Sequence, residues 1–338
     1  MYTLVLGGLG FIGLNYINQN IKKNKIICVD NLSYSANIQE LNSLNKNKNF
    51  YFIKSNISNK KILLDIFEKY KIKSIINFAA ETHVDNSIVN PQIFLKRNIQ
   101  DFVSFLINLT EISKNKKIKI KYLHISTDEV YGSLKINQNK FKESNKFYPN
   151  SPYSASKASA ENFLRAWGQT YGLNYIIVNP SNNFGPYQDK EKFIPTIINS
   201  LLKKKQIPIY GDGSNIRDWL FVKDHCKIIN QILLKGKNMQ SYNIGGNNEW
   251  TNLNLVKKIC EIFNSINPDF DHLKLISFVK DRPGHDFRYG INNLKIKKLI
   301  GAKLLKSKFE ENLKETINWY LNNKKIFFKN KMKKSVFG

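Results

Sequence analysis

A glycine-rich turn near the start of the chain constrains the fold more than any other feature of this sequence. The apolar run Tyr2–Leu6 leads directly into the segment Gly7–Gly13 (GGLGFIG). Gly7, Gly10 and Gly13 have the spacing of a dinucleotide-binding turn, in which glycines permit a tight bend and a close approach of backbone N–H groups to a pyrophosphate. The turn therefore predicts a strand followed by a helix whose N-terminus faces phosphate.

An acidic residue after the second apolar run supports this interpretation. Asp30 directly follows the predicted strand 25–29. A carboxylate there would accept hydrogen bonds from an adenosine ribose and repel a 2′-phosphate, so NAD is favoured over NADP. A plain turn residue is the alternative. The order strand, glycines, helix, strand and acid favours the cofactor site.

The rest of the first half alternates short β-branched runs with longer amphipathic segments, which predicts an α/β fold with a Rossmann-type, doubly wound parallel sheet. Predicted strands cover residues 2–6, 25–29, 50–54, 74–78, 119–126 and 174–178, and predicted helices cover 12–23, 60–70, 91–113 and 153–171. Ile207–Gly211 and Asp281–His285 are predicted loops. We expect an NAD-binding domain over residues 1–180 and a basic tail over 323–338. Residues 181–322 are expected to form mainly a smaller α/β subdomain for nucleotide-sugar binding, with some segments returning to the sheet.

Composition bears on partners and location. The net charge is +27, from 53 Lys+Arg against 26 Asp+Glu, and a basic surface can attract nucleic acid. The lysines are spread along the chain without a nucleic-acid-binding motif, so we expect no nucleic-acid partner. No apolar stretch approaches the roughly 20 residues that span a bilayer, and the three cysteines form no CxxC pair. We expect a cytoplasmic protein without a membrane partner or a metal site.

Two segments carry groups suited to proton transfer. Tyr153 and Lys157 are four positions apart at the start of a predicted helix and share a face, so the cation is expected to lower the pKa of the phenol from about 10. A tyrosinate can take a proton from a sugar hydroxyl while hydride leaves the same carbon. Thr127, Asp128 and Glu129 follow the strand 119–126. The two acids can serve one site only if the chain leaves extended geometry there. Helix capping is the alternative use of this segment.

Taken together, six segments resemble the extended short-chain dehydrogenase/reductase superfamily and, within it, the dTDP-glucose 4,6-dehydratase family. They are 7–13, 79–87, 126–132, 153–157, 180–187 and 281–285, and the resemblance runs from about residue 4 to residue 321. The distinguishing element is Thr127-Asp128-Glu129. Related 4-epimerases are similar at the glycines and the Tyr/Lys pair but typically lack the two acids.

The resemblance implies a lyase of deoxysugar biosynthesis that converts dTDP-glucose to dTDP-4-keto-6-deoxyglucose with NAD. Tyr153 would deprotonate the 4-hydroxyl as hydride leaves C4, Thr127 would hydrogen-bond the same oxygen, and Lys157 would bind the nicotinamide ribose. Glu129 would then take the C5 proton while Asp128 protonates the departing 6-hydroxyl, and hydride would return to C6. Neighbouring carboxyls in a partly dry site split their titrations, so Asp128 should start protonated and Glu129 ionised.

The resemblance also implies contacts by position, and a homodimer. Implied cofactor contacts are Gly7, Gly10, Phe11, Ile12, Gly13, Asp30, Asn31, Asn56, Ile57, Ala79, Ala80, Tyr153, Lys157 and Asn183. Implied substrate contacts are Thr82, Thr127, Asn182, Lys192, Pro208, Ile209, Tyr210, Arg217, Asn252, Asp281, Arg282 and His285. Taken singly, Lys192 and Arg217 are better explained as solvated surface charges, and Asn252 as a helix cap.

Three residues depart from the family pattern. Asn56 stands where an acid near the adenine is usual, Asn86 replaces an arginine, and Arg97 replaces a small hydroxyl residue associated with the cofactor. Three alternatives remain open: a UDP-glucose 4,6-dehydratase, a nucleotide-sugar 4-epimerase and, remotely, a non-catalytic nucleic-acid-binding Rossmann protein.

Overall fold

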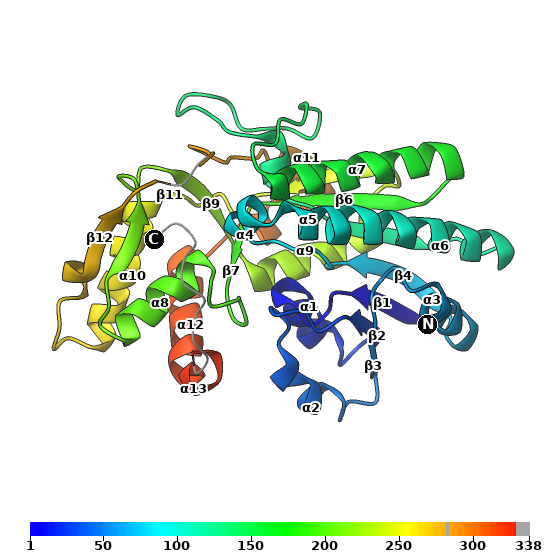
Figure 1. Ribbon diagram of the computed structural model, residues 1–338, viewed down its shortest axis with the longest axis horizontal. Helices are drawn as coiled ribbons and strands as arrows, with labels where there is room; N and C mark the ends of the chain where they lie inside the picture. The colour runs from blue at the N-terminus through cyan, green and yellow to red at the C-terminus, as the bar shows by residue number, and fades with distance from the viewer. Residues whose placement is uncertain (282–283, 329–338) are drawn as a thin grey trace.

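The computed structural model describes residues 1–281 and 284–328, and a seven-stranded parallel sheet is its centre (Figure 1). The strand order is β10-β6-β5-β4-β1-β2-β3, and all neighbouring strands run parallel. The chain builds outward from β1 through β2 and β3, then returns to build β4, β5 and β6 on the other side. Such a reversal opens a crevice at the carboxyl ends of β1 and β4. The predicted Rossmann-type fold is confirmed.

Most elements of this sheet layer lie close to the predicted ranges, whereas β10, α9 and α11 were not predicted. The strands are β1 (Tyr2–Leu6), β2 (Lys25–Asp30), β3 (Phe50–Lys54), β4 (Ile72–Asn77), β5 (Lys121–Ile125), β6 (Tyr175–Pro180) and β10 (Gln240–Ile244). The helices are α1 (Phe11–Asn20), α3 (Lys60–Lys69), α6 (Asp101–Asn115), α7 (Pro152–Tyr171), α9 (Val222–Lys235) and α11 (Leu294–Ile300).

Strand alternation divides the apolar side chains between two cores. On β1, Val5 joins a core with α1, α9 and α11, whereas Leu4 and Leu6 join a core with α3, α6 and α7. Successive side chains of a strand point to opposite faces of the sheet, so one buried strand contributes side chains to both cores. Because α9, β10 and α11 complete this layer, segments beyond residue 180 contribute to it. The domain boundary at residue 180 stays a prediction.

A smaller unit lies beside the sheet, at the left of Figure 1. It contains the three-stranded sheet β11-β9-β7, the parallel pair β8 and β12, and four helices. Their bounds are β7 (Asn182–Phe184), β8 (Ile207–Tyr210), β9 (Ile216–Phe221), β11 (Glu249–Thr251), β12 (Ile276–Val279), α8 (Phe193–Leu202), α10 (Asn252–Ile266), α12 (Phe309–Asn322) and α13 (Lys324–Phe327). A third apolar core fills it, with Phe184, Trp219 and Phe309 among its aromatic side chains.

The predicted loop at Ile207–Gly211 is wrong over its first four residues, which form β8. Ile207 and Ile209 are both 1% exposed and enter the third core, while Pro208 between them is exposed. β8 pairs with β12 alone, so it tolerates a proline at an edge position. Residues 282–283 and 329–338, which include Arg282 and most of the predicted basic tail, lie outside the described residues.

The predicted helix over 91–113 contains an irregularity that the sequence did not indicate. Between α5 (Pro91–Phe94) and α6 lies η2, a π-helical segment over Leu95–Gln100, and the Asp101 N–H bonds the carbonyl of Lys96. An i to i+5 bond adds a residue to the turn and changes the direction of the following side chains. Arg97 and Asn98 lie in this segment. Among the described residues, no helix is long and apolar enough to cross a membrane.

A test of the glycine turn follows from the space around Gly7. Gly7 has φ +68°, and a Cβ there would lie 2.6 Å from the Cα and N of Ala79; Gly172 has the same φ with nothing within 4 Å. We expect Gly172→Ala to lower the free energy of unfolding by about 1 kcal/mol through its φ alone. Gly7→Ala should cost about 1–3 kcal/mol more because of the clash. Urea unfolding of both variants measures this, and equal losses would contradict the close contact between Gly7 and Ala79.

Candidate active site and cofactor groove

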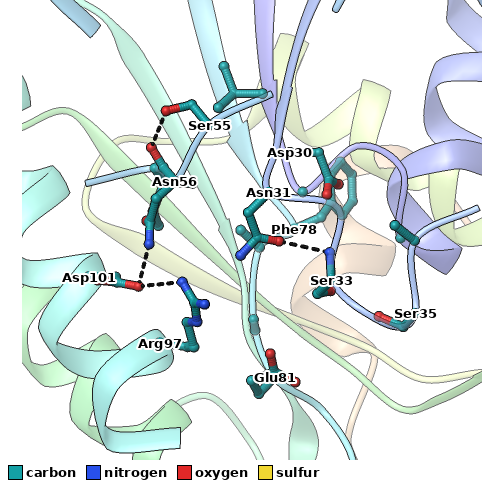
Figure 2. Close-up of a pocket in the computed structure, with 17 residues that line it drawn as sticks. Asp30, Asn31, Ser33, Ser35, Ser55, Asn56, Phe78, Glu81, Arg97 and Asp101 are labelled. Carbon is teal, nitrogen blue, oxygen red and sulfur yellow. Dashed lines mark hydrogen bonds and ion pairs between the residues drawn. The ribbon is translucent and has the colours of Figure 1, made fainter. Parts of the chain in front are cut away.

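Two adjoining pockets follow the carboxyl ends of the sheet strands. They share Gly7, Gly10, Ser35, Phe78 and Ala80 and so form one groove. The first pocket is drawn in Figure 2 and also holds Asp30, Asn31, Asn56, Ile57, Ala79, Glu81, Arg97 and Asp101. The second also holds Phe11, Ile12, Gly13, Thr82, Thr127, Asp128, Glu129, Tyr153, Lys157, Asn182, Asn183 and Lys192. Every residue predicted to contact the cofactor therefore lines the groove.

The glycines of the turn are needed for different reasons. A Cβ on Gly13 would lie 2.5 Å from the Gly7 carbonyl oxygen, so Gly13 is needed for packing. A Cβ on Gly10 would meet only that oxygen, at 3.4 Å, and Gly10 lines both pockets. Helix α1 has no side-chain cap and no acid in its first turn. The N–H groups of that turn therefore fit an anion, as a pyrophosphate would require.

Asp30 is held rigidly at the end of β2. Its carboxylate accepts the Leu9 N–H at 3.0 Å and the Leu32 N–H at 2.8 Å. Burial raises the pKa of Asp30, and these two bonds oppose that rise. The carboxylate ties the glycine turn to the loop after β2, and each oxygen retains a lone pair for a ligand hydroxyl.

Lys157 lies buried beside the end of β5. The first turn of α7 is fixed by Pro152 and by reciprocal bonds between Ser151 and Ser154. One turn further on, the Lys157 Nζ donates to the Ile125 carbonyl at 2.7 Å. The residue is 3% exposed, and burial lowers its pKa to about 8.

The expected effect of Lys157 on Tyr153 is wrong for the protein alone. Burial, followed by the negative charge of Glu129, raises the pKa of the Tyr153 phenol, while a hydrogen bond with Thr127 acts in the opposite direction. The Lys157 ammonium is engaged by the Ile125 carbonyl, and desolvation of the phenolate dominates. A four-residue spacing indicates a shared helix face but gives no measure of burial.

The chain turns where the two acids would otherwise point apart. Residues Asp128–Tyr131 form a 3₁₀ turn, and the Thr127 hydroxyl caps it by accepting the Glu129 N–H at 3.3 Å. The departure from extended geometry that the site requires is therefore present. Both acids line the same pocket, so capping and a place in the groove coexist.

Asp128 has the environment of a neutral acid. It is 3% exposed, and burial, Glu129 and Asp218 raise its pKa well above the usual range against the opposing charge of Arg217. Its Oδ1 accepts the Thr127 hydroxyl at 3.4 Å, whereas its Oδ2 has no hydrogen-bond partner among the described residues. Tyr289 donates to Glu129 at 3.5 Å. A protonated Asp128 can give its proton to a ligand in the groove.

Two buried residues behind the site were missed by the sequence analysis. Glu161 is 0% exposed and accepts the Asn179 amide at 2.6 Å; the same amide donates to the Thr127 carbonyl at 3.1 Å. Glu161 also favours the charged form of Lys157, one turn earlier on α7. It thus connects Lys157 with the 3₁₀ turn. The spacing from Lys157 was a usable signal, because a buried ammonium needs a countercharge.

The residues predicted to bind substrate fall into separate groups. Thr82, Asn182 and Lys192 line the second pocket, and the Lys192 Nζ donates to the Thr82 carbonyl at 2.7 Å. Arg217, which is 6% exposed, donates to the carbonyls of Ile216, Asp286 and Phe287 and lies over the Tyr289 ring. Its positive charge acts to lower the pKa of Asp128, although Arg217 lines neither pocket.

The remaining substrate candidates lie in the smaller unit, outside the groove. His285 bonds Asp281 at 2.7 Å and lies edge to face with Tyr210. Pro208 is exposed, whereas the Ile209 side chain is in the core and only its backbone can reach a ligand. Asn252 is buried at the start of α10, but the capping side chain there is Thr251.

Comparison with known proteins agrees with this geometry. The family model described as GDP-mannose 4,6 dehydratase matches residues 4–316. The dTDP-glucose 4,6-dehydratase of Haemophilus influenzae is 43% identical, over 96% of this chain and 98% of its own. The dTDP-glucose 4,6-dehydratase of Bacillus anthracis, solved with NAD, has a TM-score of 0.85 at 41% identity, over 97% of this chain and 99% of its own. That of Streptomyces venezuelae, also solved with NAD, has a TM-score of 0.86 at 34% identity, over 96% and 98%.

A Rossmann sheet with a glycine-turn groove and a Tyr–Lys pair at its carboxyl edge defines an enzyme of the short-chain dehydrogenase/reductase type. The match to relatives of 4,6-dehydratase type extends over nearly the whole length of both chains. This chain belongs to the dTDP-glucose 4,6-dehydratase family. The family predicted from the sequence is confirmed.

The connection through Glu161 can be tested by its charge. Glu161→Gln keeps the shape of the side chain but removes a charge that raises the pKa of Lys157, so that pKa, about 8, should fall further. Lys157 is charged below its pKa, and the variant should therefore lose the ammonium at a lower pH. We expect the alkaline limb of the pH profile of kcat to move to lower pH.

The exposed carboxylate Glu111, which pairs with Lys60 and lines neither pocket, provides the matched control as Glu111→Gln. Its profile should be unchanged. If Glu161→Gln loses thermal stability but keeps the pH profile, the residue has only a structural role.

Proposed function

We propose that this chain catalyses the NAD-dependent dehydration of dTDP-glucose to dTDP-4-keto-6-deoxyglucose. One observation carries the proposal: a buried acid with a strongly raised pKa, Asp128, lines the same pocket as Glu129, Tyr153 and Lys157, next to a turn that fits a pyrophosphate. Relatives about 40% identical over nearly the full chain carry this activity in their names.

NAD, when bound, would accept hydride from C4 and return it to C6 within one turnover. The glycine turn and Asp30 would hold its pyrophosphate and ribose. Tyr153 would take the proton of the 4-hydroxyl, and Thr127 already favours the ionised phenol. Below about pH 8 Lys157 carries a charge one helical turn from Tyr153, fixed by the Ile125 carbonyl. That charge would favour negative charge on the reacting oxygen.

The two acids would divide the elimination of water. Asp128 would donate its proton to the 6-hydroxyl as it leaves, because its environment favours the neutral form. Glu129 would remove the C5 proton, which a 4-ketone makes acidic. The 3₁₀ turn places both side chains in one pocket, whereas an extended strand would send them to opposite faces.

Dehydration explains more of the site than the alternatives do. A 4-epimerase would leave Asp128 and Glu129 without a role. UDP-glucose as substrate would use the same catalytic groups, so the choice of dTDP rests on the names of the relatives. A nucleic-acid-binding protein would not need a buried Tyr–Lys pair at the end of a groove. A cytoplasmic location stays a prediction.

We further propose a homodimer formed through the outer face of α6 and α7. Phe163, Trp167 and Tyr171 lie one turn apart on α7, with ring centroids 6.2 and 5.2 Å apart. The Trp167 indole N–H donates to the Thr110 hydroxyl on α6. Ile107, one turn before Thr110 on the same helix, is 52% exposed. Apolar side chains on two adjacent helices favour a helical bundle between copies.

Isotope transfer tests the reaction. Purified protein is incubated with C4-deuterated dTDP-glucose and no added NAD. The expected product is a 4-keto-6-deoxy sugar with deuterium at C6, because resident NAD would carry the label from C4. Mass spectrometry and NMR locate the label. An epimer that retains deuterium at C4 would contradict the dehydratase assignment, as would the absence of turnover.

The same assay separates the steps. Glu129→Gln should lower kcat for elimination by about 10²–10⁴-fold, the usual worth of a general base, and should leave NAD bound. Loss of NAD from this variant would point to a structural role.

The dimer is tested by a charge on the proposed face. Phe163→Glu should shift the protein from dimer to monomer in size-exclusion chromatography with light scattering, because a buried charge costs several kcal/mol. Leu234→Glu, at a 70% exposed apolar position on α9, is the matched control and should stay dimeric. A dimer in both variants would place the interface elsewhere.

A further inference from the structure

Two of the three departures from the family pattern meet at one carboxylate. Asn56 donates its amide to Asp101 Oδ2 at 2.8 Å, and Arg97 donates its Nη1 to the same oxygen at 3.2 Å. Figure 2 shows both side chains directed at Asp101, across the pocket from Asn31 and Ser33. Asp101 was not a candidate in the sequence analysis, and its role here rests on these contacts.

The amide of Asn56 has a fixed orientation. Its Oδ1 accepts both the N–H and the hydroxyl of Ser58 at 3.1 Å, so its NH₂ group faces Asp101. An acid at position 56 would place two carboxylates within hydrogen-bond distance, and like charges that close repel strongly. The amide is therefore complementary to Asp101. The carboxylate on this side of the pocket therefore comes from α6 and not from the loop after β3.

Arg97 presents a guanidinium to the same pocket. It comes from the π-helical segment η2, and its side chain is 32% exposed. The Nη1 is anchored on Asp101, while the buried Nε has no hydrogen-bond partner among the described residues. A planar cation held at one edge offers its face for stacking on an aromatic ring.

The position of the three residues identifies what they face. A dinucleotide with its pyrophosphate at Gly7 and Gly10, and its ribose at Asp30, extends its base past the end of β2 towards β3. Asn56, Arg97 and Asp101 line that end of the same pocket. Within the described part of the chain, the contact of Asp101 Oδ1 is a long one, 3.5 Å from the Ser58 hydroxyl, and this oxygen can accept a further donor.

We propose that Asp101 and Arg97, with Asn56 as their support, form the adenine-recognition wall of the cofactor site. The inference rests on the proposed use of NAD. Asp101 accepts a hydrogen bond from the exocyclic amine of the base, and Arg97 stacks on the ring. Asn56 holds the Asp101 carboxylate in place. The acid that the family usually has at position 56 is thus replaced in this chain by an acid at position 101.

The test compares NAD with nicotinamide hypoxanthine dinucleotide, which carries a carbonyl oxygen in place of the adenine amine. Both are titrated calorimetrically into the full chain after removal of resident dinucleotide. A carboxylate accepts from the amine and repels the carbonyl, so the native protein should bind NAD about tenfold more tightly. Asp101→Asn should bring this ratio close to one, because its amide can donate to the carbonyl.

Two further variants separate base recognition from structural support. Asn56→Asp/Asp101→Asn returns the carboxylate to the other side of the same hydrogen bond and should restore the preference for NAD. Arg97→Ala should weaken both dinucleotides by the same factor, about tenfold, because stacking does not read the amine. Lys96→Ala removes an exposed positive charge from the same turn and is the matched control.

The outcomes distinguish the two proposals. A native protein that binds neither dinucleotide contradicts the use of NAD itself. If NAD binds but Asp101→Asn weakens both dinucleotides equally, or if the exchanged pair keeps a ratio of one, then Asp101 does not read the base. Thermal unfolding of each variant establishes that the comparison is made on folded protein.

Discussion

The buried ammonium of Lys157 is the interaction on which the arrangement of the site depends. Its bond to the Ile125 carbonyl draws α7 against the end of β5, and Glu161 offsets the cost of burying the charge. This contact fixes the position of Tyr153 relative to the carboxyl ends of the strands. Through Asn179 the same network holds the carbonyl of Thr127 and so the turn that carries both acids. The relative positions of α7, β5 and the 3₁₀ turn thus depend on the Lys157 ammonium.

Low dielectric surroundings bring the pKa values of the buried carboxyls and of the Lys157 ammonium closer together. Burial raises the pKa values of Asp128 and Glu161 and lowers that of Lys157 to about 8. In water, a carboxylic acid and an ammonium differ by about six units. As this difference shrinks, moving a proton among side chains and substrate costs less free energy. A groove that binds a dinucleotide thereby also becomes suited to repeated proton transfer.

The sequence predicted those features that have a local cause. The glycine turn, the strands of the first half and the start of the helix predicted at residue 153, which the structure places at Pro152, each follow from a few adjacent residues. β8 was missed because two isoleucines around Pro208 give too short a pattern, and η2 because a π-helical segment leaves no clear periodicity. Glu161 and Asp101 were missed for another reason. Each has one partner at helical spacing, Lys157 for Glu161 and Arg97 for Asp101. Their other partners, Asn179 on β6 and Asn56 after β3, lie on elements that no spacing in the chain relates to them.

The position of β10 has a consequence for the order in which this protein is made. β10 completes the edge of the main sheet next to β6, and α9 and α11 cover one face of that sheet. When the ribosome has released the first 180 residues, the backbone of β6 is still an unpaired edge, and apolar side chains such as Val178 lack their cover. The nucleotide-binding layer becomes complete only after residue 300 has emerged. A nascent chain of this length therefore depends on protection from aggregation until its last third arrives.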